Sequence, residues 1–251
     1  MVGAVNVTAP LHSGVGVALV TIFADGAVDG AVDVAATAER ARRCVELGVS
    51  SVLVAGTTGE AARLTVADRV ALVSAVKDAV AGVPVIVGTG RDTADAALET
   101  SAKLAAEGEA DALLVFCPEE AEPAEFFGAV RHEASGRPVL AYHNPALAAR
   151  PLDTEELPLL DVDGVKDSSG SSSRLADLVE LRMRVYVGSA TQLLLAGSCG
   201  AAGAILALAN VAPTDCIAAW NGDAAAQRRL FQMHRRAGRG LPSFLKTAQP
   251  L

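Results

Sequence analysis

The sequence has few aromatic residues and no long apolar run. Phe, Tyr and Trp make up 4% of the 251 residues, whereas 51% of the residues are hydrophobic. Aliphatic side chains and alanine must therefore fill most of the core. No uninterrupted apolar run approaches the roughly 18–20 residues that a membrane span requires, so we expect no membrane-spanning segment.

Paired cysteines and an excess of positive charge are also missing. Cys44, Cys117, Cys199 and Cys216 lie far apart without a C-x-x-C pair, which favours reduced core cysteines of a cytoplasmic protein over metal or disulfide roles. The first residues, "MVGAVNVTAPLHSG", have no basic segment ahead of an apolar one, so we expect no secretory signal. The net charge of −8 and the pI of about 5.0 argue against nucleic acid as a main partner.

Short β-branched runs alternate with longer helical patterns along the whole chain. The runs are almost continuously hydrophobic, as is typical of strands buried on both faces of a parallel sheet. We predict eight strands, at 15–23, 51–56, 83–90, 111–117, 137–143, 163–167, 184–189 and 201–209. Periodicity predicts four helices, at 31–48, 65–82, 92–108 (with Asp92 as cap) and 172–183. A glycine ends each of the first three patterns.

This alternation predicts an α/β fold with right-handed crossovers, either an open doubly wound sheet or a closed barrel. Eight units favour the (β/α)8 TIM barrel. No linker or repeat divides the chain, so we predict one domain over 1–251, with the barrel at about 15–210 and a shortened helical extension at about 213–251. In such barrels the chemistry gathers at the carboxyl ends of the strands. The strand ends therefore supply the candidate residues.

One lysine occupies such a position. Of four lysines, Lys77 and Lys103 lie within helical patterns and Lys246 lies near the C-terminus, whereas Lys166 ends a predicted strand in "GVKDSSG". A lysine in a barrel mouth can be an anion anchor, an ion-pair partner or a Schiff-base nucleophile. The third role requires the neutral amine, which burial in an apolar strand favours. All three interpretations stay open on the residues alone.

Two further strand ends carry hydroxyl groups. Tyr142 ends the strand before that of Lys166, so the two side chains can converge, and a phenol near an amine can relay protons. The alternative is a core tyrosine with a satisfied hydroxyl. The turn "GTTGE" (56–60) offers two hydroxyls and accessible N–H groups suited to a carboxylate, or is only a tight turn. "GTGRDT" (88–93) lacks the third glycine of a dinucleotide fingerprint, so we predict no Rossmann site.

Together and in this order, several segments resemble a known enzyme family. "VTIF", "GTTGE", "GTG", "YHNP", "GVKDSSG" and "GAILALANVAP" are similar to the dihydrodipicolinate synthase and N-acetylneuraminate lyase family of pyruvate-dependent Schiff-base (class I) lyases and aldolases. The resemblance runs from about residue 15 to about residue 237. It implies that Lys166 forms an imine with pyruvate or another 2-oxo acid, and that Tyr142, hydrogen-bonded to Thr57, relays the proton.

The resemblance also implies how the substrate is held. Gly56 and Thr58 would hold the carboxylate of the 2-oxo acid, Ile205 would contact pyruvate through its backbone, and Leu147 would face the second substrate. It implies a small-molecule 2-oxo acid and an aldehyde as partners, a homo-oligomer (dimer or tetramer), and neither metal nor organic cofactor.

Three departures from the family pattern bear on the substrate and on the assembly. After the fourth strand, "CPEEAEP" places Glu119 and Glu120 where the synthases carry paired tyrosines. In "YHNPALAAR", Leu147 stands where the synthases have a carboxylate-binding arginine, and Arg150 follows three residues later. Leucine cannot supply the bidentate contact of a guanidinium. "PAL" resembles the sialic-acid lyase branch, and the chain ends earlier than its relatives.

Several hypotheses remain on the sequence. The leading one is a class I lyase or aldolase acting on a 2-oxo acid and an aldehyde. The second is a true 4-hydroxy-tetrahydrodipicolinate synthase in which Glu120 and Arg150 replace the missing groups. A third is a barrel that binds 2-oxo acids without turnover. A phosphosugar aldolase would need a phosphate site after the last two strands, where only "GSAT" (188–191) qualifies.

Overall fold

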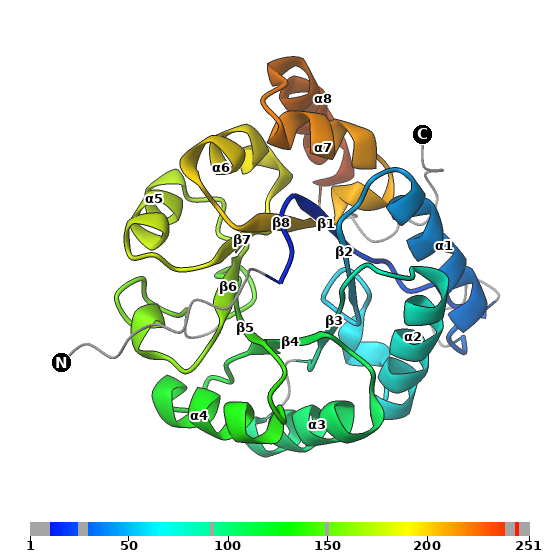
Figure 1. Cartoon of the computed structure of the whole chain (residues 1–251), viewed down its shortest axis with the longest axis vertical. Helices are drawn as coiled ribbons and strands as arrows, with labels where there is room; N and C mark the ends of the chain where they lie inside the picture. Colours follow the sequence, from blue (N-terminus) through cyan, green and yellow to red (C-terminus); the bar gives the residue numbers. More distant parts are fainter. Residues whose placement is uncertain (1–10, 25–29, 91–92, 149–150, 239–243, 246–251) are drawn as a thin grey trace.

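The computed structural model describes residues 11–24, 30–90, 93–148, 151–238 and 244–245. Eight parallel strands close into a barrel in chain order, and β8 pairs back onto β1 (Figure 1). The strands are β1 Val15–Ala18, β2 Ser51–Val54, β3 Val85–Gly88, β4 Ala112–Phe116, β5 Val139–His143, β6 Gly164–Asp167, β7 Val185–Val187 and β8 Gly203–Leu206. The predicted (β/α)8 TIM barrel is confirmed.

Helices surround the barrel (Figure 1). They are α1 Val34–Glu46, α2 Val66–Ala79, α3 Ala94–Glu107, α4 Pro123–Glu133, α5 Ser172–Glu180, α6 Leu193–Cys199, α7 Pro213–Trp220 and α8 Ala224–Ala237. The crossover from β5 to β6 carries only the short 3-10 helix η3, Leu157–Leu159, among its described residues. Two helices, α7 and α8, follow β8. That residues 1–251 form a single domain stays a prediction.

Every observed strand lies inside a predicted one but is shorter. The run at 201–209 stops pairing at Leu206 because Leu208–Asn210 turn into the 3-10 helix η5. The Asn210 side chain then takes over the pairing beyond β1: its Oδ1 accepts from Val20 N at 3.1 Å and its Nδ2 donates to Ala18 O at 2.7 Å. The apolar runs therefore continue beyond the paired strand residues into loops, where side chains such as Asn210 bond the backbone N–H and C=O groups.

The helix ends also differ in detail from the sequence pattern. Thr93 caps α3 by accepting from Ala96 N, whereas the predicted cap Asp92 lies outside the described residues. The helix α2 ends at Ala79, before the glycine at position 82. Thr65 begins α2 with a reciprocal capping box, in which Thr65 and Asp68 bond each other's backbone N–H groups.

Alternate strand residues fill the barrel interior. Ten side chains form this inner cluster: Ala18, Leu53, Ile86, Ala112, Leu114, Phe116, Leu140, Tyr142, Tyr186 and Ile205. The residues between them point outward and pack against the helices in the larger core cluster. This arrangement follows from the two-residue period of a strand. Seven of the ten are aliphatic, as the composition predicts, and the other three are aromatic.

The segment before β1 closes the barrel floor. Leu11 N donates to the Tyr186 hydroxyl at 3.1 Å, and the His12 ring lies 4.8 Å from the Tyr186 ring. Burial, which outweighs the backbone hydrogen bonds to its hydroxyl, raises the pKa of Tyr186. Of the two tyrosines, Tyr186 therefore lies at the barrel floor, and only Tyr142 is a candidate for the active site at the mouth.

Three of the four cysteines match the expected core positions. Cys44, Cys117 and Cys216 are buried, but Cys199 is exposed at the end of α6, so the expectation of a core position was wrong for that residue. Among the described residues, none of the helices has both the length and the hydrophobicity of a transmembrane span.

Candidate active site

Neighbouring strands bring Lys166 and Tyr142 together at the carboxyl end of the barrel. Tyr142 on β5 is in register with Lys166 on β6, and the Lys166 Nζ lies 4.2 Å from the centre of the Tyr142 ring. Both side chains are buried, at 5% and 8% exposure respectively. The amine also donates to Ser168 Oγ at 3.3 Å. A lysine buried in this way is held away from bulk water, above an aromatic face.

The acid next to Lys166 in the sequence does not pair with it. Asp167 points outward, where its carboxylate accepts from Arg174 Nε at 2.6 Å and from Ser169 N at 2.8 Å. Within the described part of the chain, we find no ion pair of Lys166. The ion-pair interpretation of this lysine therefore loses support, and the amine is left facing the barrel mouth.

The Tyr142 hydroxyl is the centre of a hydrogen-bond network. Asn144 Nδ2 donates to it at 3.0 Å, and Thr57 and Ser168 also hydrogen-bond to it. Burial acts to raise the pKa of Tyr142, but the positive charge of Lys166 and these three hydrogen bonds outweigh it and lower the pKa to about 8. A phenol with such a pKa exchanges protons near neutral pH far more readily than an ordinary tyrosine.

The "GTTGE" turn carries Thr57 to the mouth in a strained backbone. Ala55, just before the turn, and Glu60, its last residue, both have positive φ angles, of 52° and 56°. Such angles are costly outside glycine and persist where surrounding contacts enforce them, often at functional sites. Here Thr21 Oγ1 donates to Gly59 O at 2.7 Å and Ala61 N donates to Gly56 O at 3.2 Å, which holds the turn in place.

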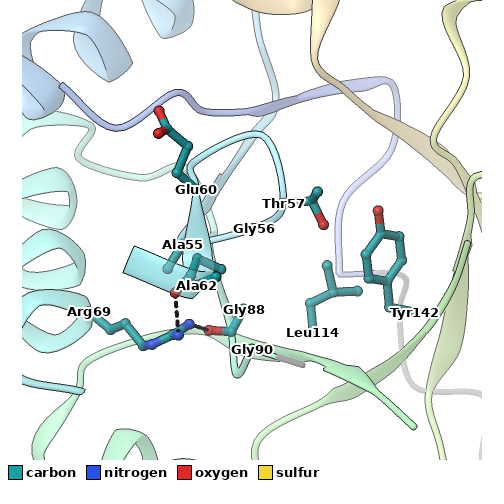
Figure 2. Close-up of a pocket in the computed structure, with 11 residues that line it drawn as sticks. Ala55, Gly56, Thr57, Glu60, Ala62, Arg69, Gly88, Gly90, Leu114 and Tyr142 are labelled. Atoms are coloured by element: carbon teal, nitrogen blue, oxygen red, sulfur yellow. Dashed lines mark hydrogen bonds between the residues drawn. The ribbon is translucent and has the colours of Figure 1, made fainter. Parts of the chain in front are cut away.

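A cavity of about 170 Å³ opens beside this turn (Figure 2). Thr57 and Tyr142 lie next to each other at one end of it, and Arg69 lies at the opposite end with its guanidinium donating to Gly88 O and Ala61 O. The cavity is lined by Ala55, Gly56, Thr57, Glu60, Ala61, Ala62, Arg69, Gly88, Gly90, Leu114 and Tyr142. The Thr57 and Tyr142 hydroxyls, backbone, apolar side chains and the charged Glu60 and Arg69 therefore surround a space large enough for a small molecule.

The remaining predicted residues lie around the same mouth. Gly56 lines the cavity, Ile205 belongs to the inner cluster on β8, and Leu147 packs against that cluster from the loop after β5. Thr58 is half-buried in the "GTTGE" turn next to Thr57. The structure thus brings Lys166 and Thr57 each into contact with Tyr142 and gathers the others nearby. Their roles stay predictions.

Comparison with known proteins decides the family. Residues 11–244 match the model of the dihydrodipicolinate synthetase family. The chain belongs to this family. The resemblance in the motifs is thereby confirmed, and the protein is an enzyme, a lyase of the dihydrodipicolinate synthase family.

Individual relatives agree with this assignment. The chain is 33% identical over 199 residues to 4-hydroxy-tetrahydrodipicolinate synthase of Acidithiobacillus ferrooxidans, covering 74% of this chain and 68% of that protein. It is 34% identical over 218 residues to the enzyme of the same name from Salinibacter ruber, covering 81% and 70%.

Solved structures of the family share the fold. YagE, a prophage protein of the dihydrodipicolinic acid synthase family from E. coli K12 in complex with pyruvate, aligns with a TM-score of 0.81 at 25% identity, covering 93% of this chain and 86% of that one. A putative dihydrodipicolinate synthetase from Pseudomonas aeruginosa aligns with a TM-score of 0.77 at 29% identity, covering 94% and 87%.

The glutamates that replace the tyrosines of the synthases do not reach the Tyr142 hydroxyl. Glu120 Oε1 accepts from Ala94 N at 3.0 Å, in the first turn of α3, and Glu119 is exposed. A carboxylate at a helix N-terminus is stabilised by the free N–H groups there. A compensating relay role for Glu120 therefore has no support. Arg150, the other proposed compensation, lies outside the described residues.

Two residues at the site were not singled out from the sequence. Asn144 and Ser168 both hydrogen-bond to the Tyr142 hydroxyl. The sequence offered one signal for each: Asn144 stands before proline in "YHNP", as is typical of a side chain that caps a turn, and Ser168 follows Lys166 by two residues. Neither signal reveals that the two side chains converge on one oxygen.

No group of three or more His, Cys, Asp or Glu side chains placed to hold a metal occurs in the described ranges. The expectation that the enzyme needs neither a metal nor an organic cofactor stays a prediction.

Gly188, at the end of β7, makes room for Ser168. A Cβ atom on Gly188 would overlap the Ser168 hydroxyl and lie 3.2 Å from Asp167 O. We expect Gly188→Ala to lower the free energy of unfolding by about 1–3 kcal/mol, the usual cost of overpacking. Thermal or urea unfolding of the variant measures this.

Gly128 in α4 is the matched control, because a Cβ there meets nothing within 4 Å. Gly128→Ala should raise the stability by about 0.5–1 kcal/mol, since alanine is the better helix former. Equal effects of the two substitutions would contradict the steric argument.

Proposed function

We propose that this protein is a class I lyase or aldolase that joins pyruvate, or another 2-oxo acid, to an aldehyde through an imine on Lys166, or cleaves the adduct. The observation that carries the proposal is the buried Lys166 amine, 4.2 Å from the centre of the Tyr142 ring and without an ion pair in the described part of the chain. The relatives' membership of a family of synthases and the pyruvate bound to YagE support the choice of 2-oxo acid. Trapping of the imine with borohydride tests it.

Imine formation uses the groups that meet at Tyr142. The Lys166 nitrogen forms a bond to the carbonyl carbon while the π electron pair of the carbonyl moves onto its oxygen. That oxygen takes the proton of the Tyr142 hydroxyl, and the nitrogen loses a proton in return. A second proton delivered to the same oxygen lets water leave as the nitrogen lone pair forms the C=N bond. Tyr142 gives and takes these protons because its pKa is lowered to about 8.

The protonated imine then acts as an electron sink. Removal of a proton from the adjacent carbon gives an enamine, whose carbon attacks the carbonyl of the aldehyde; the reverse sequence cleaves the adduct. In the proposed arrangement Thr57 orients the Tyr142 hydroxyl, and the "GTTGE" turn offers Thr58 and backbone N–H groups to the carboxylate of the 2-oxo acid. This scheme requires neither metal nor organic cofactor.

A synthase acting on aspartate semialdehyde is the second candidate, because the curated relatives carry that activity in their names. Leu147 argues against it. Its side chain packs against the apolar inner cluster, where the synthases of the resemblance place a carboxylate-binding arginine. We therefore propose an acceptor aldehyde that presents hydroxyl groups or an apolar chain in place of a carboxylate.

Leu147→Arg is expected to raise kcat/KM for aspartate semialdehyde by roughly ten- to a hundred-fold. The reason is that a charge-assisted hydrogen bond is worth about 1.5–3 kcal/mol. Leu147→Met is the matched control, since it keeps an apolar side chain of similar volume. Steady-state kinetics with a panel of aldehydes measures the change. If the wild-type kcat/KM for the semialdehyde exceeded that for every other aldehyde, the synthase activity would be the correct function.

A further inference from the structure

The loop after β5 places an amide directly on the Tyr142 hydroxyl. Asn144 Nδ2 lies 3.0 Å from that oxygen, and Asn144 Oδ1 accepts from Ala146 N at 3.2 Å. The backbone N–H of Ala146 can only donate, so the amide oxygen must face it. The NH2 group must therefore face Tyr142, and the orientation of the amide follows from the network.

An amide NH2 group can only donate, so Asn144 bonds a lone pair of the phenol oxygen. The hydroxyl proton must then point elsewhere, toward Thr57 or Ser168. A donor of this kind favours the phenolate over the neutral phenol. Asn144 thereby directs the proton of Tyr142 toward the hydroxyl groups at the mouth and stabilises the form that accepts a proton.

Few charged groups compete with this effect around Tyr142. Lys166 from β6 is the charged group over its ring, and Glu60 and Arg69 line the same cavity farther from it. From β4 the neighbours are apolar: the Phe116 ring meets Tyr142 edge-on at 5.8 Å, and Leu114 lines the cavity. In the loop after β4, Glu120 is bonded to Ala94 N, and Glu119 and Glu122 are exposed to solvent.

We propose that Asn144 is a positioning residue of the active site, which holds the Tyr142 hydroxyl by donating to its oxygen and so tunes the proton relay from within the same loop. The proposal rests on the proposed function only in naming Tyr142 as the relay. The contact itself belongs to the free enzyme. It can therefore be tested without any substrate.

The test is the ultraviolet titration of phenolate between about pH 6 and 11, a range that spans ordinary tyrosine ionisation. The chain has only two tyrosines, and Tyr186 lies on the barrel floor with a raised pKa, so the first phenolate to appear belongs to Tyr142. Tyr142→Phe should remove that first step, and Tyr186→Phe should leave it. The wild-type midpoint is expected near pH 8.

Two substitutions separate the donor from a merely structural role. Asn144→Leu removes the donor, and Asn144→Asp keeps an oxygen for Ala146 N while replacing the donor to Tyr142 with an anionic oxygen. We expect the midpoint to rise by about one pH unit or more in Asn144→Leu and at least as far in Asn144→Asp. An unchanged midpoint in Asn144→Leu would show that the amide does not stabilise the phenolate, and that result would overturn the proposal.

A kinetic measurement adds a second readout. In Asn144→Leu, imine formation with pyruvate at neutral pH should slow by about tenfold, while KM for pyruvate stays within about twofold. A changed KM at an unchanged rate would contradict the positioning role. Failure of the wild type to form any imine would remove the proposed function, yet leave the titration result standing.

Discussion

Lys166→Arg is expected to abolish the stable adduct that the wild-type protein forms with pyruvate and borohydride. Borohydride reduces the imine to a secondary amine, which intact-mass analysis detects as an added mass. Arginine keeps the positive charge but is not a nucleophile at neutral pH. Because the amine of Lys166 is buried at the barrel mouth and bonded to Ser168 Oγ at 3.3 Å, we expect the loss to be complete.

Two of the other lysines supply the matched controls. Lys77 pairs with Asp111 at 2.8 Å and Lys103 pairs with Glu99 at 2.6 Å, both on helices outside the barrel. Lys77→Arg and Lys103→Arg should therefore keep the wild-type level of labelling. If Lys166→Arg were labelled to the same extent as the wild type, another lysine would carry the imine and the site described here would be wrong.

Tyr142→Phe should slow imine formation by on the order of 10²–10⁴, the usual contribution of a positioned acid–base group. Phenylalanine keeps the ring under Lys166 and against Phe116, so packing changes little while the proton relay is lost. Rapid-quench trapping with borohydride measures the rate. The inflection of the wild-type pH profile near pH 8, which reports the lowered pKa of Tyr142, should disappear in the variant.

Two comparisons make this prediction specific to the hydroxyl of Tyr142. Thr57→Val should cost less, since Thr57 orients the phenol and does not itself carry the proton. Tyr186→Phe removes a hydroxyl that accepts from Leu11 N on the barrel floor, so it should lower stability without slowing the chemistry. A Tyr142→Phe enzyme with the wild-type rate would mean that water or Ser168 carries the proton alone.

Together these experiments separate three properties of the site. The borohydride trap reports whether Lys166 is the nucleophile, the Tyr142 variant reports the relay, and the aldehyde panel with Leu147→Arg reports the acceptor. Ser168 links the first two, since it hydrogen-bonds to both the Lys166 amine and the Tyr142 hydroxyl. Its place depends on Gly188, whose missing Cβ leaves the space that the serine occupies.

The barrel and its central pair of side chains could be read from the sequence. Parallel strands buried on both faces are runs of apolar residues, and eight such runs with helices between them close most readily into a barrel. Lys166 was the one lysine at a strand end, and Tyr142 ended the preceding strand. Since neighbouring parallel strands end at the same rim, their convergence followed from the pattern, and the register of Tyr142 with Lys166 confirms it.

The direction of individual polar side chains was decided only by the tertiary structure. Glu120 turned to the N-terminus of α3, Asp167 turned to Arg174 behind the barrel, and Asn144 turned to the Tyr142 hydroxyl. Each orientation is fixed by a hydrogen bond between groups that the loop conformation brings together. Composition and periodicity do not predict such a bond. Apolar burial follows a repeat along the chain, whereas a hydrogen bond depends on the position of two atoms to within a few tenths of an ångström. The fold could therefore be predicted from the sequence, whereas the hydrogen bonds that set the properties of the active site could not.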